Sequence, residues 1–387
     1  MRKRRPLAWG ALLIALGLPA LAAAPDKVWV KGRAEPLMQV ITDESIDEIK
    51  FGGAASMPAV AVVKIEYADA PDAFKRGLDR LQQGLYGEAI RLFEAASRLT
   101  TPRAFWLKPA CAYHVALCHL EDGTDLAAAD AKFRELLQAH PKTRWLFHAL
   151  HGLGRSLYGQ GKADPAKYDA AFAQFDKLAK EAASRAGADE WVYTAQIWQA
   201  RTLMEQGQNA AAKYDDALRL VRRVIADPGI QKLHDLLIQA QAVEATILVR
   251  MGQSAKAIDN LKALVKSIAP HVAEEIEKGA ETRMQRTEAQ CYNALGQAYF
   301  KLAATSKREE DLRWALLSYL WTVVLYPRSE FAAEHAEALY HAAVCFERLK
   351  QAPRATELRN ELTTKYPDSP WARLVTSAKA PAPKKGD

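Results

Sequence analysis

The feature that most constrains this chain is an apolar pattern of helical period that returns in pairs. From Pro71 onward, apolar residues recur at the spacing of one helix face, and the first such set is Phe74, Leu78, Leu81 and Leu85. We predict that Gly87 breaks this helix, because a second apolar face follows it. Two amphipathic helices joined by a short turn form an antiparallel hairpin. Such pairs are predicted to continue to about residue 374.

The pairs share a motif in which a small residue, a large apolar or aromatic residue and a proline follow in fixed order. The same twelve-residue interval leads from Ala129 to Pro141, from Ala315 to Pro327 and from Ala355 to Pro367. A proline cannot continue the helical hydrogen-bond ladder, so these prolines are predicted to end second helices. Pro228 and Pro270 are assigned the same role.

One pair carries a family signature. Tyr292, Leu295, Gly296, Tyr299, Ala315, Tyr319 and Pro327 match in order the W-x2-L-G-x2-Y…A-x3-F…P pattern of tetratricopeptide repeats. Residues 73–374 therefore resemble a tetratricopeptide-repeat array. The resemblance implies an all-α fold, an α-solenoid whose antiparallel helix pairs stack into a right-handed superhelix with one concave face. Spacings beyond the usual period of about 34 residues around Asp164, Ala212 and Lys307 predict lengthened turns.

The segment before the helices differs in composition. Short β-prone runs between Val28 and Tyr67 are separated by Gly, Pro and Asp, which predicts three or four antiparallel strands. We assign residues 25–70 to a small β-rich module, residues 71–374 to the repeat array and residues 375–387 to a disordered tail. A module of this size is marginal by itself and is expected to pack on the first helices.

The first 24 residues have the three parts of a secretory signal peptide. A basic run at Arg2–Arg5 precedes an apolar stretch, Leu7–Leu18, and a small-residue site follows at Ala20–Ala22. The apolar stretch is shorter than the roughly 20 residues that span a bilayer, and no later segment is apolar enough to do so. We therefore expect an exported protein, periplasmic or extracellular. An uncleaved anchor is the alternative.

Charge and cysteine usage argue against a nucleic-acid-binding protein and against a fold held together by disulfides. The formal net charge is +7, but the excess lies mostly in the leader and the tail, so no nucleic-acid partner is predicted. Cys111 and Cys118 are two helical turns apart, too far for a disulfide. The cysteines, which also include Cys291 and Cys345, are therefore predicted to be free, buried packing residues.

No catalytic motif is present: the chain lacks a nucleophile elbow, an H-E-x-x-H motif, a phosphate-binding loop and a dinucleotide loop. His148 and His151 have a spacing that suits a metal, but no second ligand pair accompanies them. Neither an enzyme nor a cofactor or metal is predicted. Tryptophans are expected to pack between repeats rather than to line a ligand cage; they are Trp145, Trp191, Trp198, Trp314, Trp321 and Trp371.

The repeat resemblance implies that first helices line the concave groove. Transferred position by position, it gives a candidate peptide-binding groove of His148, His151, Arg155, Tyr158, Arg201, Arg250, Asn293, Gln297 and Lys301. The basic members suit the carboxylates or the chain end of an extended peptide. The alternative is that these are ordinary solvent-facing polar residues.

These observations predict an exported, non-catalytic scaffold or adaptor that binds a protein or peptide of the cell envelope through the groove. The residues from Leu362 to Ala372 support the envelope setting, because they resemble the repeat ends of exported bacterial helical-repeat proteins. A structural subunit whose repeats serve self-assembly within an envelope complex is the second hypothesis, and an enzyme is the third.

Overall fold

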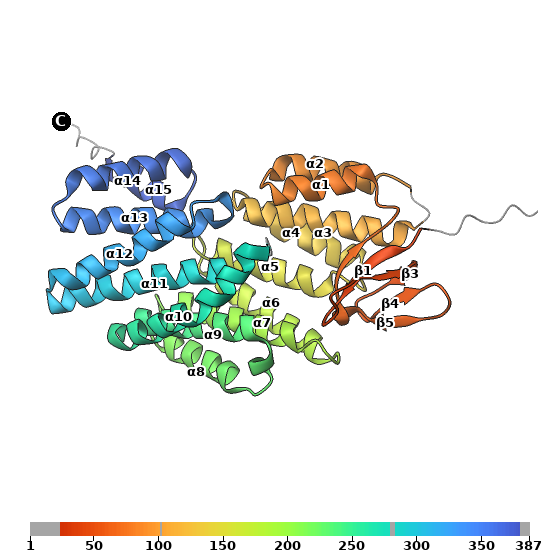
Figure 1. Ribbon diagram of the computed structural model, residues 1–387, viewed down its shortest axis with the longest axis horizontal. Coiled ribbons are helices and arrows are strands. Elements are labelled where there is room, and N and C mark those ends of the chain that lie inside the picture. The colour runs from red at the N-terminus through yellow and green to blue at the C-terminus, as the bar shows by residue number, and fades with distance from the viewer. Residues whose placement is uncertain (1–23, 101–102, 279–282, 380–387) are drawn as a thin grey trace, which may run out of the picture.

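The computed structural model describes residues 24–100, 103–278 and 283–379. The predicted signal peptide lies outside these residues except for Ala24, and so do residues 380–387 of the predicted tail. Within the described part, short strands come first and fifteen α-helices follow (Figure 1). This order confirms the predicted fold class, a helix-pair array preceded by a small β module.

The β module contains more strands than predicted. Six short strands form two three-stranded antiparallel sheets with the orders β2-β1-β6 and β3-β4-β5. Their bounds are β1 Asp26–Val30, β2 Leu37–Gln39, β3 Ile41–Glu44, β4 Glu48–Phe51, β5 Ser56–Pro58 and β6 Val62–Glu66. Val28 is paired with Ile65 across β1 and β6, and both are buried in one core with side chains of the first three helices. The module is thus part of the N-terminal end of the array.

A buried ion-pair cluster at Arg103 is one of the contacts that tie the module to the helices. The guanidinium of Arg103, just before α3 (Ala104–Asp122), donates to the carboxylates of Asp26 at 2.9 Å and Asp69 at 2.7 Å. Asp26 is fully buried and also accepts from the backbone amides of Ile41 and Ala68. The hydrogen bonds that the Asp26 carboxylate accepts therefore hold the β module against the segments that precede α1 and α3.

The helices pair in sequence order. First helices are α1 Asp72–Gln82, α3, α5 Leu146–Gln160, α7 Asp189–Gln206, α9 His234–Arg250, α11 Arg283–Ser306 and α13 Ala332–Arg348. Second helices are α2 Tyr86–Ser97, α4 Leu126–Ala139, α6 Ala166–Ala183, α8 Ala212–Ala226, α10 Ser254–Lys278, α12 Glu309–Leu325 and α14 Ala352–Lys365, and α15 Pro370–Lys379 closes the array beyond the predicted end at residue 374. From α3 to α13, each first helix also contacts the next first helix, which makes a continuous inner layer.

Two predicted helix breaks were wrong. The first turn is made by Gly84, which has a φ of +71°, whereas Gly87 lies inside α2. A left-handed φ is accessible to glycine at low cost, and that local requirement decides where the chain turns. Pro270 does not end its helix either, because α10 continues to Lys278. Ile268 and Val272 on either side of it are buried in the same core, so packing offsets the missing hydrogen bond.

The predicted packing positions are confirmed. Ala129 and Ala315 are fully buried, and helices α4, α12 and α14 each end two residues before Pro141, Pro327 and Pro367. The four cysteines are free and buried. None of the helices in the described part combines the length and apolar character that a membrane-spanning segment needs.

The array is curved. In Figure 1, α1 and α2 at one end and α13–α15 at the other lie on the same side of the middle helices, opposite α8. Arg286 of α11 is close enough to Tyr86 of α2 to oppose the rise that burial causes in the pKa of that tyrosine. The curvature therefore brings α2 and α11, which are far apart in sequence, toward one another.

Candidate functional site

The nine predicted groove residues lie on four first helices, α5, α7, α9 and α11. We call the side chains through which first helices face one another the inner surface. On α5 and α7 it contains an alternating series of rings. The ring of His148 lies 5.4 Å from that of Trp145 and 4.7 Å from that of Trp191, and His151 lies 5.6 Å from Trp198. These tryptophans pack as predicted, but they pack on the candidate site itself.

Burial keeps the two histidines neutral. It lowers the pKa of His148 to about 3, with a further contribution from Arg144, and it lowers the pKa of His151 well below its usual value, with Arg155 adding to the shift. The described residues contain no group of three or more His, Cys, Asp or Glu side chains arranged to hold a metal. At neutral pH the histidines present uncharged rings to the inner surface.

The arginines of the inner surface lie beside tryptophan and carboxylate. Arg155 donates to Glu121 of α3 at 3.0 Å, and its guanidinium is 5.9 Å from the ring of Trp198. Arg201 is 5.2 Å from the same ring, and burial lowers its pKa. Both arginines are half-buried rather than solvent-facing. The indole between them gains cation–π contacts that hold the cluster in place.

Three predicted residues on α11 are used in helix contacts. Asn293 is buried and donates to the backbone carbonyl of Glu334 at 2.9 Å, and Gln297 donates to Glu337 at 2.7 Å, both on α13. Lys301 donates to the carbonyl of Val249 on α9 at 2.9 Å. These bonds join neighbouring first helices. The polar side chains in this part of the expected groove are therefore already hydrogen-bonded within the protein.

Sequence reasoning missed the acidic side chains of the inner surface. Glu121, Glu334 and Glu337 accept from its basic and amide groups, and Tyr158 donates to Glu205 at 3.4 Å. Burial raises the pKa of Glu337, and Glu334 adds to this shift. One of these acidic residues could have been predicted from the sequence, because Glu205 is four residues after Arg201 and so shares its helix face. The surface is therefore mixed in charge rather than uniformly positive.

Several buried polar atoms of the inner surface have no hydrogen-bond partner in the described part of the chain. They are Trp145 Nε1, His148 Nδ1, His151 Nε2, Arg201 Nε, Arg250 Nε and Asn293 Oδ1. The indole and guanidinium nitrogens can only donate. A buried donor without a partner costs about 1–3 kcal/mol. Because neighbouring side chains cover these atoms, a ligand that supplies acceptors gains this energy only when the side chains turn toward it.

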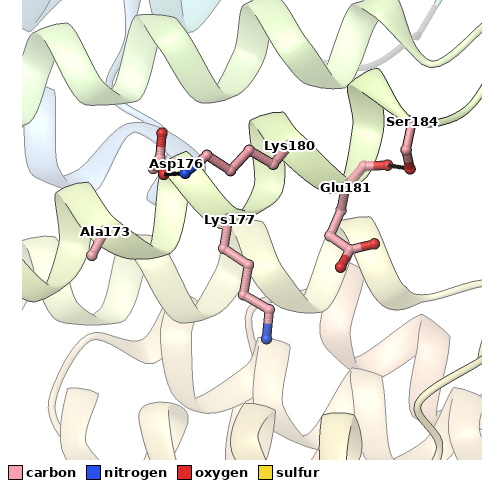
Figure 2. Close-up of a pocket in the computed structure, with 6 residues that line it drawn as sticks. All are labelled: Ala173, Asp176, Lys177, Lys180, Glu181 and Ser184. Atoms are coloured by element: carbon pink, nitrogen blue, oxygen red, sulfur yellow. Dashed lines mark hydrogen bonds and ion pairs between the residues drawn. The ribbon is translucent and has the colours of Figure 1, made fainter.

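The most evident surface hollows lie elsewhere. Figure 2 shows a hollow of about 450 Å³ on α6. There Asp176 pairs with Lys180, the Ser184 hydroxyl donates to the backbone carbonyl of Glu181, and the side chain of Lys177 points away from both pairs. All its lining residues come from one helix and carry both charges, so it has no convergent chemistry. A second hollow of about 200 Å³ lies between α2, α3 and α4. Neither includes a predicted groove residue.

Comparison with known proteins agrees with this architecture. Residues 337–369 match the family model described as tetratricopeptide repeat, which places one repeat over most of α13 and α14. No curated protein matches the sequence. Among solved structures, a monomeric mutant of IFIT1 with Gppp-AAAA is 12% identical, with a TM-score of 0.38, over 79% of this chain and 71% of that chain. The TPR domain of P58(IPK) is 13% identical, with a TM-score of 0.18, over 81% of this chain and all of that domain.

These two similarities are too distant to assign a ligand. The family match lies within an array of consecutive helix pairs, and glycines of the first helix lie against aromatic rings of the second in the pairs α1–α2, α5–α6 and α11–α12. Tetratricopeptide repeats commonly serve as protein-interaction scaffolds, which is the general role that this fold suggests. Residues 337–369 are therefore similar to one tetratricopeptide repeat, and they lie within a longer array of stacked helix pairs.

Proposed function

We propose that this protein is a non-catalytic scaffold that binds an extended segment of another protein along the inner surface, and that the partner belongs to the cell envelope. The observation that carries the proposal is the pair of half-buried arginines on α7 and α9, Arg201 and Arg250, whose Nε atoms have no partner among the described residues. Side-chain or terminal carboxylates of a peptide supply the acceptors that these donors lack. The flanking tryptophan rings add apolar contact area.

The test compares two double variants of the purified protein. Arg201→Gln with Arg250→Gln removes the two guanidinium charges and their Nε–H donors but keeps much of each stem. Arg219→Gln with Arg223→Gln is the matched control, because both side chains are exposed on α8. Binding is measured by crosslinked capture from an envelope extract and with synthetic acidic peptides, at low and moderate salt.

The inner double variant should lose at least about tenfold in affinity, because truncated anchor residues in desolvated contacts typically cost this much or more. Its residual binding should also depend less on salt. The control should bind like the parent. Equal binding by the two double variants, with unchanged helical signal, would show that the inner surface is not the binding site.

Export is the second part of the proposal, and its support is the tripartite leader pattern of residues 1–24. Residues up to about Ala22 are removed, and the mature chain is periplasmic or extracellular. N-terminal sequencing of the protein recovered from an exporting bacterial cell tests this. A start close to residue 23 is expected, and an intact Met1 on exported protein contradicts cleavage.

A further inference from the structure

Helix α12 exposes an apolar stripe. The exposed fractions are 45% for Trp314, 41% for Leu317, 44% for Trp321, 68% for Val324 and 47% for Leu325. Trp314, Leu317, Trp321 and Val324 follow one another at intervals of three, four and three residues, which places them on one helix face. The other faces of α12 are also rich in apolar residues. A helix that is apolar all round is normally buried, so no part of the described chain covers this face. The prediction that Trp314 and Trp321 pack between repeats was wrong.

Tyrosine rings of α11 pack against Trp314 and Trp321 and restrict their movement. The ring of Trp314 stacks on that of Tyr299 of α11, and the ring of Trp321 stacks on that of Tyr292, each with 6.2 Å between centroids. Tyr299 is itself buried. Indoles fixed in this way lose little conformational freedom when they bind, and tryptophan is enriched among residues that dominate interfaces.

The pattern of the stripe is complementary to itself. When two copies of α12 are laid antiparallel about a two-fold axis at the level of residue 319, Trp314 lies at the level of Val324 of the other copy and Leu317 at the level of Trp321. Antiparallel helices also align their dipoles favourably, and isologous contacts of this kind are the commonest in homo-oligomers.

We propose that α12 is the centre of a two-fold interface with a second copy of this chain. A lipid surface fits less well, because the stripe has acidic residues at its start, Glu309 and Glu310, and Arg313 is paired with Glu309 at 2.7 Å. Membrane-surface helices instead carry an excess of Lys and Arg beside their apolar face. The interface lies away from the inner surface, so this inference and the proposed ligand site stand or fall separately.

Sedimentation velocity over a micromolar concentration series tests the proposal. The parent should form dimers. Leu317→Glu should raise the dimer dissociation constant at least tenfold, because each copy places a carboxylate against apolar partner residues near the axis. Val63→Glu is the matched control, since Val63 is an exposed apolar residue on β6, 65% accessible, and it should leave the dimer intact. Circular dichroism should show the same helical content for all three proteins.

A second experiment tests the antiparallel register of the two α12 helices. Trp321→Lys alone should also weaken the homodimer, whereas a mixture of Leu317→Glu and Trp321→Lys chains should form heterodimers, because residue 317 of one copy faces residue 321 of the other. A parent that stays monomeric throughout, or a Leu317→Glu variant that dimerises like the parent, overturns the proposal. A monomeric parent that floats with phosphatidylglycerol vesicles, where Leu317→Glu does not, overturns it in favour of a lipid surface. A mixture that stays monomeric overturns the antiparallel register.

Discussion

At the level of single residues, glycines on first helices make room for aromatic rings of second helices. A Cβ built on Gly154 or Gly296 would lie well under 3 Å from ring atoms of Phe175 or Tyr319. Both rings are buried, so neither can move aside without disturbing the core. This is the physical content of the small-residue and aromatic positions in the repeat signature.

Gly296→Ala is therefore expected to destabilise the protein by about 1–3 kcal/mol, the usual cost of overpacking a tight contact. Gly87→Ala is the control, because no atom lies within 4 Å of a Cβ at this helical position. It should stabilise by about 0.5–1 kcal/mol, since alanine favours a helix over glycine. Urea unfolding measures both changes, and similar effects of the two substitutions would mean that the assigned contact is absent.

The buried histidines make stability depend on pH. Because burial lowers the pKa of His148 to about 3 from about 6.5 in an unfolded chain, its contribution to stability is complete above about pH 6.5 and is lost as the pH falls toward the folded value. His148→Phe keeps the ring contacts but removes the titration. The variant should match or exceed the parent at pH 7.

Between about pH 6 and pH 4 the variant should lose less stability than the parent, by up to about 1.4 kcal/mol per pH unit, the value for one proton. His114 and His341, whose pKa values burial also lowers, to about 3 and about 4, maintain an acid dependence in the variant. Denaturant midpoints at successive pH values give both curves. Curves that run parallel across this range would rule out His148 as a source of the dependence.

At the level of elements, the β module depends on the helices because its own strands are three to five residues long. Arg103→Ala should destabilise its attachment by about 3–5 kcal/mol, because it leaves Asp26 charged and buried without its ion pair. Arg219→Ala, which breaks an exposed pair with Asp216, should change stability by less than about 1 kcal/mol.

Hydrogen exchange locates the effect of Arg103→Ala. Amides of β1 and β6 should lose protection first, while those of α9 to α14 keep theirs. If Arg103→Ala and Arg219→Ala gave the same exchange pattern, the buried ion pair would not be what fixes the module.

At the level of the whole molecule, each helix pair contacts mainly its neighbours, so stability is shared locally along the array. Leu362 of α14 is fully buried in a small terminal core with Leu339 and Val375. Leu362→Ala should lower the free energy of unfolding of this terminal region by about 2–5 kcal/mol. Exchange protection should fall in α13–α15 and stay at the parent level in α3–α6. A uniform loss of protection along the chain would show that the array unfolds as one unit.

The local pattern of the sequence determined the helix pairs, most of their ends and the small residues between them. It could do so because helical periodicity, proline and glycine act within a few residues of their own position. The repeat resemblance assigned the nine candidate site residues to first helices, where the structure also puts them. It could not locate Gly84 as the first turn or foresee that α10 continues through Pro270.

Only the tertiary structure decided which polar groups of the inner surface meet and which apolar face stays uncovered. Curvature accumulates from small rotations between successive pairs, so contacts such as Arg201 with Gln290, 89 residues apart at 3.5 Å, are not written in any local pattern. In the folded chain, Asn293, Gln297 and Lys301 form hydrogen bonds to neighbouring helices. The Nε atoms of Arg201 and Arg250 have no partner in the part of the chain that the structure describes. Helix α12 is apolar on every side, so its sequence could not reveal that Trp314 and Trp321 face outward, because the choice of face depends on where the adjoining pairs lie.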